Sequence, residues 1–504
     1  MSETRAAKNE ETLDPDDWEA LRVLGHRMVD DMLDYLQTLR ERPVWQPIPQ
    51  EVKEHLNQPL PISAQGAEAA YDDFRQHVLP HPMGNIHPRF WGWVIGTGTP
   101  FGALSEMLAA TMNPNVGGAD QGAVYVEQQV LDWCKEMLGY PSEASGLLVS
   151  GGSMANLVGL TVARNVKAEF DVARQGVQAA PRRLVMYGST EMHNSLQKAA
   201  ELLGIGNEGL RRIPVNSEFQ IDLAALVTAI SEDRARGFQP CCVIGNAGTV
   251  NTAAFDDLNA LADICHDENL WFHVDGAFGA LAALSPELRA LVKGMERADS
   301  LAFDLHKWMY MPYEAGCILV RHAEEHHRTF SVSGAYLAHA KRGLSAGATW
   351  FSEYGVQLSR NFRALKIWML MKEHGLEKYG RVIQQNVEQA RYLADLVEAR
   401  PELELLAPVT LNIVCFRYVD RRLSEARLNE LNEELLAQLQ ESGVAVPSNT
   451  ILDGKYALRV AITNHRSRRE DFDLLIDKLL ELARHHVNKM VGQAAELTAE
   501  LAAE

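Results

Sequence analysis

Short apolar runs alternate with helical stretches between about Phe90 and Arg321. The runs are rich in β-branched and aromatic residues, and they read RLVMYGS, CCVIGNAG, WFHVDGA, SLAFD and GCILVR. Stretches with helical spacing separate them at 191–204, 222–236 and 256–269. Strands separated by helices favour parallel pairing in a sheet that is covered on both faces. The pattern therefore predicts an α/β fold with a large, mostly parallel sheet, whose ligands should bind beyond the carboxyl ends of the strands.

The N-terminal region has a different, purely helical pattern. A helix is expected to begin near Asp16 or Asp17, and a second helical stretch covers 67–77. Apolar residues follow the first start at helical spacing: Leu21, Leu24, Met28, Met32, Leu36 and Leu39. This face must be buried on its own domain or on a partner subunit. We therefore expect residues 1–85 to form a helical extension that serves dimerisation.

The C-terminal third predicts a second, smaller unit. A long helical stretch at 357–400 is followed by two strand-like runs, TLNIVCFRYV and KYALRVAIT, and by helices near 422–442 and 468–490. Two strands and two helices suit a small α/β domain. We therefore expect a large domain at 86–385, a small domain at 386–492 and a frayed tail at 493–504.

Charge and cysteine content narrow the possible partners and compartment. The 504-residue chain has a net charge of −19, so nucleic acid and anionic membranes are poor partners. It contains six cysteines without a C-x-x-C pair, which disfavours a zinc ribbon and suits a reducing compartment. No apolar run approaches the roughly 20 residues that span a bilayer. With its acidic, polar N-terminus, the chain is expected to be cytoplasmic and to act on a small molecule.

The run SGGSMAN at 150–156 precedes a helical stretch and predicts an anion site. Small residues there let backbone N–H groups and the positive end of the helix dipole approach a phosphate. A plain capped helix start is the alternative. The run also nearly matches a nucleophile elbow, with Ala155 where the motif requires glycine. A serine hydrolase that uses Ser153 is therefore a remote alternative function.

Lys307 and Asp275 both follow apolar strands, where an exposed charge is unexpected. Partial desolvation lowers the pKa of a lysine and makes an imine with an aldehyde feasible. A buried aspartate requires a cationic partner, and a protonated pyridine nitrogen is one. A metal site built from His273, Asp275 and His306 is the rival interpretation. We disfavour a metal, because we expect His273 and Asp275 to alternate along the strand and point to opposite faces.

Together these segments resemble the pyridoxal-phosphate-dependent (group II) decarboxylases of the aromatic-L-amino-acid and glutamate decarboxylase superfamily. The resemblance rests on DLHKW, on HVDGAFG about thirty residues earlier, and on the ordered spacing back to His193 and SGGSMAN. It extends from HPRFWGW at 87–93 to LRVAITNHR at 458–466. It implies a homodimer of the aspartate aminotransferase-like fold (fold type I), with pyridoxal 5′-phosphate as cofactor. The implied reaction is decarboxylation of an L-amino acid to an amine and CO2.

The resemblance also implies a role for each matching residue. Lys307 holds the cofactor as an imine, Asp275 pairs with the pyridine nitrogen, and His193 stacks on the ring, although a lone histidine can equally cap a helix. The remaining cofactor-binding residues are Gly152, Ser153, Thr249, Ala277 and His306. Phe90, Trp93 and Arg466 are implied to bind the substrate. The neighbouring aromatic residues suit an aromatic or bulky apolar substrate, but they suit a buried core at a dimer interface equally well.

Two positions depart from the family pattern. Asp304-Leu305 stands where the aromatic enzymes read Asn-Pro, and an aspartate cannot donate a hydrogen bond to a phosphate. Phe351 stands where those enzymes place a proton-donating tyrosine, and Tyr354 follows three residues later. Tyr354 could reach the same place after a shift of the loop, and His193 is a second possible donor. Phenylalanine at this point accompanies aldehyde formation in related plant enzymes, so an oxidative decarboxylase-deaminase (aldehyde synthase) is the alternative function. A non-catalytic relative is improbable, because Lys307, Asp275 and His193 are all present.

Overall fold

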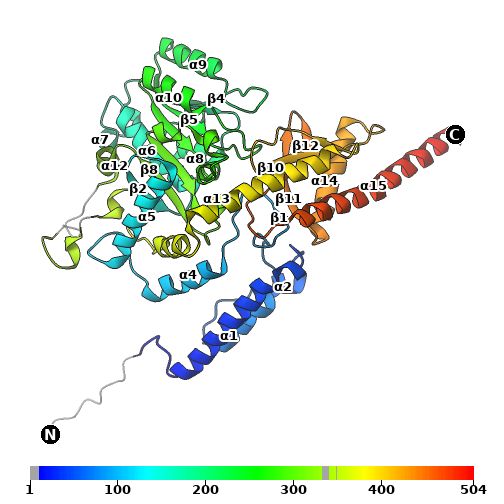
Figure 1. Cartoon of the computed structure of the whole chain (residues 1–504), viewed down its shortest axis with the longest axis horizontal. Helices are drawn as coiled ribbons and strands as arrows, with labels where there is room; N and C mark the ends of the chain where they lie inside the picture. Colours follow the sequence, from blue (N-terminus) through cyan, green and yellow to red (C-terminus); the bar gives the residue numbers. More distant parts are fainter. Residues whose placement is uncertain (1–10, 332–339, 348, 504) are drawn as a thin grey trace, which may run out of the picture.

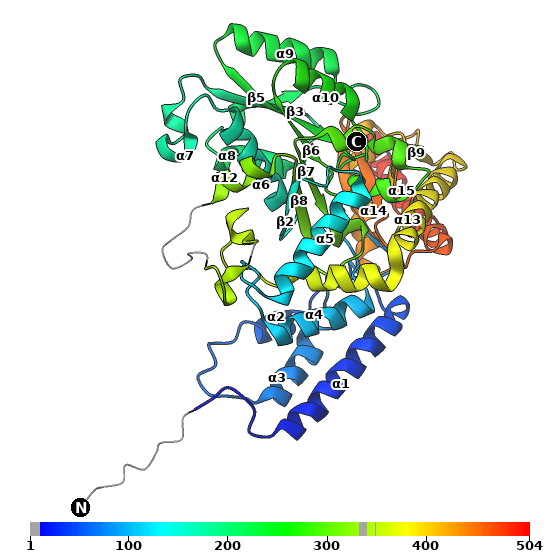
Figure 2. The same cartoon turned by 60° about the vertical axis from the view of Figure 1, so that its left-hand side comes forward.

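Two β-sheets and a helical extension make up the chain in a computed structural model (Figures 1 and 2). The structure describes residues 11–331, 340–347 and 349–503. The first ten residues of the expected extension and the last residue of the expected tail therefore lie outside the description.

The larger sheet has seven strands in the order β2-β8-β7-β6-β5-β3-β4. Their bounds are β2 Ser145–Val149, β3 Leu184–Ser189, β4 Leu210–Ile213, β5 Gln239–Asn246, β6 Trp271–Asp275, β7 Ser300–Asp304 and β8 Gly316–Val320. Strands β4, β3, β5, β6 and β7 pair in parallel, and β8 is antiparallel to both β7 and β2. The predicted mixed, mostly parallel α/β sheet is confirmed. Strands β2, β3, β5, β6 and β7 therefore all end at one edge.

Helices cover both faces of this sheet, so every residue of β3, β6, β7 and β8 is buried. The helices of this part of the chain are α4 Pro100–Met112, α5 Gly122–Leu138, α6 Gly152–Lys167, α7 Val172–Gln175, α8 Asn194–Leu202, α9 Leu223–Ala235, α10 Leu258–Asp267, α11 Leu305–Trp308 and α12 Ala323–Phe330, of which α5, α6, α9 and α10 contact the strands of the sheet. Asp222 and Asp257 cap α9 and α10 by accepting hydrogen bonds from their first turns. Burial on both faces explains why these strands read as continuous apolar runs.

The smaller sheet has the order β1-β11-β12-β10-β9. Its strands are β1 Phe90–Trp91, β9 Leu403–Leu405, β10 Ile413–Tyr418, β11 Val446–Leu452 and β12 Lys455–Ala461, packed with α14 Glu425–Glu441 and α15 Arg469–Ala503. Helix α13, Arg363–Glu398, kinks at Gly375 (φ +69°) and runs through the expected boundary at residue 385. Strand β1 crosses over from the N-terminal side, where Phe90 pairs with Val446. The two units therefore share a helix and a strand.

The extension contains α1 Trp18–Gln37, α2 Gln50–His55 and α3 Ala67–Asp73, which continues into a π-helical turn at Phe74–Val78. Asp17 caps α1 by accepting from the N–H groups of Glu19 and Ala20. No residue of α1 is fully buried in the single chain. Figure 2 shows α1 and α3 lying side by side and away from both sheets.

A buried ion pair fastens the segment before α13 to the large sheet. The guanidinium of Arg360 pairs with Glu127 of α5 and donates to the carbonyl oxygens of Val116 and Leu148, each at 2.7 Å. Both charged side chains are almost completely buried. Burial raises the pKa of Glu127, and Arg360 opposes that effect. Removal of either partner would therefore leave the other charged group buried and unpaired.

We predict that Arg360→Leu destabilises the protein by about 3–5 kcal/mol, because it leaves the Glu127 carboxylate buried and unpaired. Chemical denaturation measures the change in the free energy of unfolding. Arg381→Leu is the matched control, since Arg381 pairs with Glu377 on the exposed surface of α13 and should contribute less than about 1 kcal/mol. A loss below about 1 kcal/mol for Arg360→Leu would contradict the prediction.

Candidate active site

The predicted chemical residues converge at one edge of the large sheet. Gly152 and Ser153 follow β2, His193 follows β3, Thr249 follows β5, Asp275 ends β6, and Lys307 follows β7. Since these five strands run in the same direction, their carboxyl ends place the residues around one site.

Asp275 is a buried carboxylate with two hydrogen bonds and no cationic partner. The side chain is 5% exposed. Oδ1 accepts from the backbone N–H of Ala277 at 3.1 Å, and Oδ2 accepts from Asn156 Nδ2 at 3.0 Å. Within the described residues, no lysine, arginine or histidine forms an ion pair with it. A buried carboxylate in this state can receive a cation from a ligand.

A chain of buried hydrogen bonds orients the Asn156 amide. Burial lowers the pKa of His273 to about 3, so its ring is neutral. His273 Nδ1 lies 2.8 Å from Ser300 Oγ, which also accepts from Trp271 Nε1, and His273 Nε2 lies 2.9 Å from Asn156 Oδ1. Trp271 can only donate, so the consistent assignment has Ser300 donating to Nδ1 and Nε2–H donating to Asn156. The amide N–H groups of Asn156 then face Asp275.

The expectation that His273 and Asp275 point to opposite faces of β6 is wrong. Both side chains contact the same residue, Asn156 of α6. Residues two apart in a strand share a face, which is the geometry that the structure shows. The metal site is disfavoured for a different reason, because both nitrogens of His273 are committed to hydrogen bonds.

His193 caps α8 and lies beside the same network. Its Nδ1 accepts from the backbone N–H of Ser195 at 3.2 Å and lies 2.8 Å from Ser195 Oγ, which in turn lies 3.3 Å from Asn156 Nδ2. The neutral ring therefore carries its proton on Nε2. Partial loss of hydration lowers the pKa of His193, the positive charge of Lys307 lowers it further, and Asp275 and Asp304 oppose both. The side chain remains exposed, as suits a residue that lines an open site.

Lys307 is paired with the unusual Asp304. Lys307 Nζ lies 2.9 Å from Asp304 Oδ2, and the Asp304 side chain is 1% exposed. Asp304 Oδ1 is buried without a hydrogen-bond partner. A Cβ atom at Gly152 would lie 2.9 Å from Asp304 Oδ2 and 3.5 Å from Ala277 Cβ. The carboxylate therefore lies between the lysine and the N-terminus of α6.

His306 packs at the same helix N-terminus. A Cβ atom at Gly151 would lie 3.1 Å from His306 Cε1, so the absence of a side chain there allows the close approach. His306 Nδ1 accepts from the backbone N–H of Ala315 at 3.1 Å. Burial lowers its pKa to about 4, so the neutral ring keeps a proton on Nε2. A neutral donor and free backbone N–H groups suit an anion at this end of the site.

Three expected site residues, Thr249, Phe90 and Arg466, contact other parts of the protein. The hydroxyl of Thr249 lies 3.2 Å from Thr252 Oγ1 and accepts from the N–H of Ala254. Phe90 is buried in a small cluster with Val44 and Val446. The guanidinium of Arg466 lies 3.3–3.5 Å from the carbonyl oxygens of Ile86, Thr97 and Gly98, the last two in the loop after β1.

The loop after β1 lies against the lysine segment. A Cβ atom at Gly96 would overlap the carbonyl oxygen of His306, so the two backbones are in direct contact. Trp93 in this loop is 55% exposed, with φ +53°. Its carbonyl oxygen accepts from Arg459 at 3.1 Å. Arg459 of the small domain therefore holds the loop that packs against the backbone of His306 and Lys307.

Phe351 and Tyr354, the two residues considered for the loop position of the proton donor, pack against other side chains of the chain. Phe351 is 2% exposed and packs beneath the guanidinium of Arg360, with 5.1 Å from Cζ to the ring centroid. Tyr354 is half-buried, and its ring packs 5.1 Å from that of His326 and 5.4 Å from that of His327. The Phe351 ring therefore packs on an arginine and the Tyr354 ring on two histidines of the same chain.

Sequence reasoning missed Asn156, Ser195 and the role of His273. Asn156 ends the run SGGSMAN and Ser195 stands two residues after His193, in the first turns of α6 and α8. Their positions just beyond strand ends are the signal that could have identified them.

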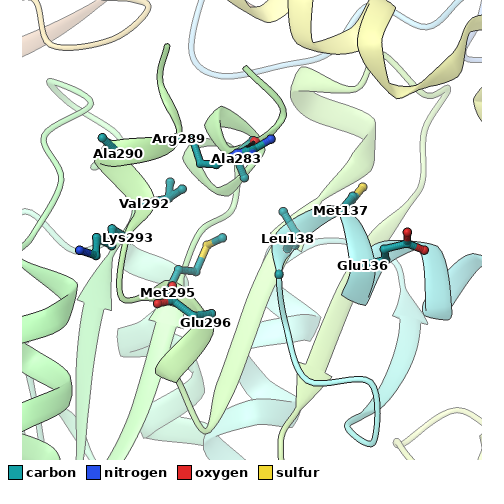
Figure 3. A pocket seen from close by; sticks show the side chains of 11 residues that line it. Glu136, Met137, Leu138, Ala283, Arg289, Ala290, Val292, Lys293, Met295 and Glu296 are labelled. Carbon is teal, nitrogen blue, oxygen red and sulfur yellow. Dashed lines mark hydrogen bonds between the residues drawn. The ribbon is translucent and has the colours of Figure 1, made fainter. Parts of the chain in front are cut away.

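A separate cavity lies far from this chemistry. It measures about 560 Å³ and is lined by residues of α5 and of the turns after β6, including Leu138, Val292 and Met295 (Figure 3). None of the candidate site residues lines it. We therefore assign it no part in the reaction.

No helix in the described part of the chain is long and apolar enough to cross a bilayer.

The residues present fit pyridoxal 5′-phosphate. Its protonated ring nitrogen is the cation that buried Asp275 lacks. Its phosphate suits the N-terminus of α6 beside Gly151 and Gly152, and its aldehyde suits the amine of Lys307. The carboxylate, the helix N-terminus and the lysine therefore match the ring nitrogen, the phosphate and the aldehyde of one molecule.

Comparisons with known proteins agree. Residues 49–419 match the family described as "Pyridoxal-dependent decarboxylase conserved domain". The chain is 34% identical over 469 residues to the aromatic-L-amino-acid decarboxylase of Bacillus atrophaeus, covering 92% of this chain and 96% of the relative. It is 32% identical over 465 residues to a phenylacetaldehyde synthase of Arabidopsis thaliana, covering 89% and 93%.

A solved structure of Oryza sativa TDC with PLP and tryptamine superposes with a TM-score of 0.87 at 25% identity, covering 94% of this chain and all of that chain. Sequence motifs, strand-end geometry and fold therefore agree, and the chain belongs to the pyridoxal-dependent decarboxylases, the lyases that use pyridoxal 5′-phosphate to release CO2 from amino acids.

Proposed function

We propose that this protein decarboxylates an L-amino acid with an aromatic or bulky apolar side chain to the corresponding amine. The observation that carries the proposal is the buried, cation-free carboxylate of Asp275, placed at the same strand edge as Lys307. The exposed ring of Trp93 in the loop over the lysine supports an apolar substrate. Relatives named as aromatic-L-amino-acid, tryptophan and tyrosine decarboxylases support the same class.

Each side chain then has one task. The cofactor supplies an electron sink for the electrons that the departing CO2 leaves behind. Asp275 keeps the ring nitrogen protonated, and Asn156 holds Asp275 in position. Lys307 Nζ is the amine that would hold the cofactor covalently, and Asp304 Oδ2, at 2.9 Å, positions it. His193 would lie against the ring face of the cofactor, where its Nε2–H is available as a donor.

The phosphate end is held by backbone and neutral donors. Gly152 and Ser153 begin α6, and His306 stands beside them with its proton on Nε2. Ala277 packs next to Gly152 under the ring, and Thr249 shapes the neighbouring loop. Arg466 acts by fixing the loop that carries Trp93, because its guanidinium lies against that loop's carbonyl oxygens.

The serine hydrolase alternative finds no support. Ser153 is exposed, and the acceptor nitrogen of His193 is already occupied by Ser195. A nucleophilic serine requires a base within hydrogen-bonding distance. The aldehyde synthase alternative rests on Phe351 and on the similarity to phenylacetaldehyde synthases.

We further propose a cytoplasmic homodimer assembled through the extension. The outward side of α1 exposes large apolar side chains: Trp18 is 62% exposed, Leu21 40% and Met28 44%. A protruding helix with such a face is typical of an interface. All six cysteines are free and buried, as suits a reducing compartment.

Incubation of the purified protein with all proteinogenic amino acids should release CO2 and amine in equal amounts, detected by mass spectrometry. In the aldehyde synthase reaction, oxygen reacts in place of the proton and gives aldehyde, ammonia and peroxide. Tyr354→Phe should raise the ratio of peroxide to amine, because proton donation by a phenol is typically worth about 10²–10⁴-fold. Phe351→Tyr should change that ratio little, since Phe351 is buried against Arg360. Peroxide and aldehyde released by wild type in step with CO2 would establish the aldehyde synthase instead.

We predict that Asn156→Leu weakens pyridoxal phosphate binding about tenfold, because Asp275 loses the donor that orients it. The dissociation constant is measured by titrating the cofactor into apoprotein. Asn165→Leu, near the last turn of the same helix, is the matched control and should bind as wild type does. An Asn156→Leu constant within about twofold of wild type would refute the role.

Leu21→Asp and Met28→Asp should dissociate the homodimer, because each places a charge on the apolar side of α1. Light scattering across a dilution series measures the molar mass. His26→Asp introduces the same charge on the other side of the helix and should leave the dimer intact. An active wild-type monomer, or equal effects from all three substitutions, would contradict the proposal.

A further inference from the structure

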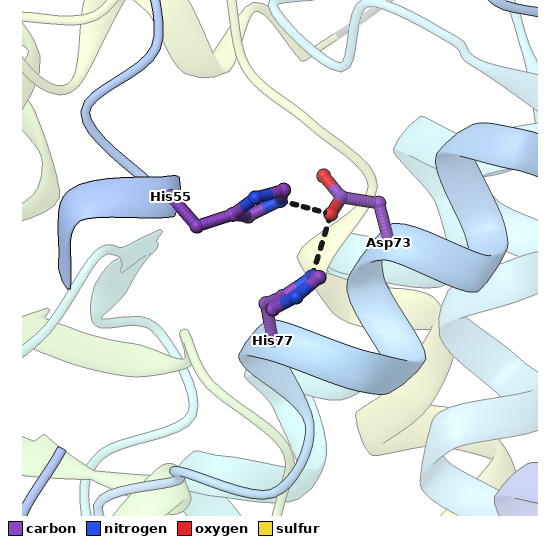
Figure 4. Close-up of side chains that lie close together, drawn as sticks. All are labelled: His55, Asp73 and His77. Carbon is purple, nitrogen blue, oxygen red and sulfur yellow. Dashed lines mark hydrogen bonds and ion pairs between the residues drawn. The ribbon is translucent and has the colours of Figure 1, made fainter. Parts of the chain in front are cut away.

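Three side chains of the extension converge away from the cofactor site (Figure 4). His55 ends α2, Asp73 ends α3, and His77 lies in the π-helical turn that follows. His55 Nε2 lies 2.5 Å and His77 Nδ1 2.7 Å from the same oxygen, Asp73 Oδ1. Among the described residues, these three form the group whose ligand atoms all lie within 4.8 Å of one another.

The local backbone creates this convergence. Leu79 N–H donates to the carbonyl oxygen of Phe74, five residues earlier, which widens the turn. Such π-helical turns are frequent at functional sites. The rings of His55 and His77 stack with centroids 3.7 Å apart and an interplanar angle of 25°. The two imidazoles therefore direct one nitrogen each toward the same point.

That point suits a divalent metal ion. Zinc binds imidazole nitrogen and carboxylate oxygen at about 2.0–2.2 Å, so an ion at the present position of Oδ1 requires shifts of roughly half an ångström in the rings. Asp73 is 47% exposed, so its carboxylate can turn back to become a ligand.

The surroundings also support coordination by His55. The Gln58 amide lies 3.1 Å from His55 Nδ1. Since amide oxygen and nitrogen exchange by a simple flip, Gln58 can accept from Nδ1–H and leave Nε2 free for a metal. An outer partner of this kind typically orients a metal-binding histidine.

We propose that His55, Asp73 and His77 bind Zn²⁺ or a similar divalent transition metal, which fastens α2 to α3. Two histidines and one carboxylate provide three protein ligands, and water can complete a tetrahedral site. The site shares no residue with the cofactor site, so its role is structural. The metal stiffens the extension that carries α1.

The test is a Zn²⁺ titration of the untagged, full-length holoprotein after chelator treatment, followed by calorimetry and by competition with a chromogenic chelator. Wild type should bind one equivalent per chain. His55→Phe and His77→Phe keep the stacked rings but remove a ligand, so they should bind more than about 100-fold more weakly. His26→Asn, an exposed histidine of α1, should bind as wild type does.

Asp73→Asn is a second variant that preserves size, and it should weaken binding at least about tenfold. The visible absorbance of the cofactor and circular dichroism verify that each variant is folded. Equal Zn²⁺ binding by wild type and the phenylalanine variants would place the metal elsewhere and overturn the proposal. Absence of Zn²⁺ binding by wild type in both assays would overturn it as well.

Discussion

The active site depends on a carboxylate that the protein buries and that no side chain in the described part of the chain supplies with a cation. Asp275 ends a strand whose residues are all buried, and its two oxygens receive one backbone and one amide hydrogen bond. Two neutral donors compensate only part of the cost of removing a carboxylate from water. Under the proposed function a protonated pyridine nitrogen would supply the rest, so cofactor binding and the electron sink would depend on the same interaction.

Hydrogen bonds between strand β6 and helix α6 hold the Asp275 carboxylate in place. Asn156 in the first turns of α6 contacts Asp275, and the neutral ring of His273 fixes the direction of the Asn156 amide. The same helix presents its N-terminus to Asp304 and His306. Helix α6 therefore links the two ends of the cofactor site. At the phosphate end the chain places a second buried carboxylate, Asp304, which lies against Lys307 Nζ.

Much of this could be predicted from the sequence because strands buried on both faces form continuous apolar runs. The runs that end at Asp275 and Asp304 marked β6 and β7 correctly, and parallel order brought their ends together. Strand β1 was not predictable, since its two residues pair with β11 more than 350 positions away. The domain boundary was also hidden, because α13 shows the same helical pattern on both sides of residue 385. The hydrogen bond from Asn156 to Asp275 could not be predicted, because the sequence does not show that α6 packs against β6.

Replacement of Asp275 by asparagine tests the account most directly, because the amide keeps the shape of the side chain and removes the charge. Turnover is measured with saturating cofactor, and the visible spectrum establishes that the cofactor remains bound. Loss of an ion pair that acts in the transition state should lower turnover at least about a hundredfold. Turnover of Asp275→Asn within about threefold of wild type, with cofactor bound, would show that the buried carboxylate does not maintain the electron sink.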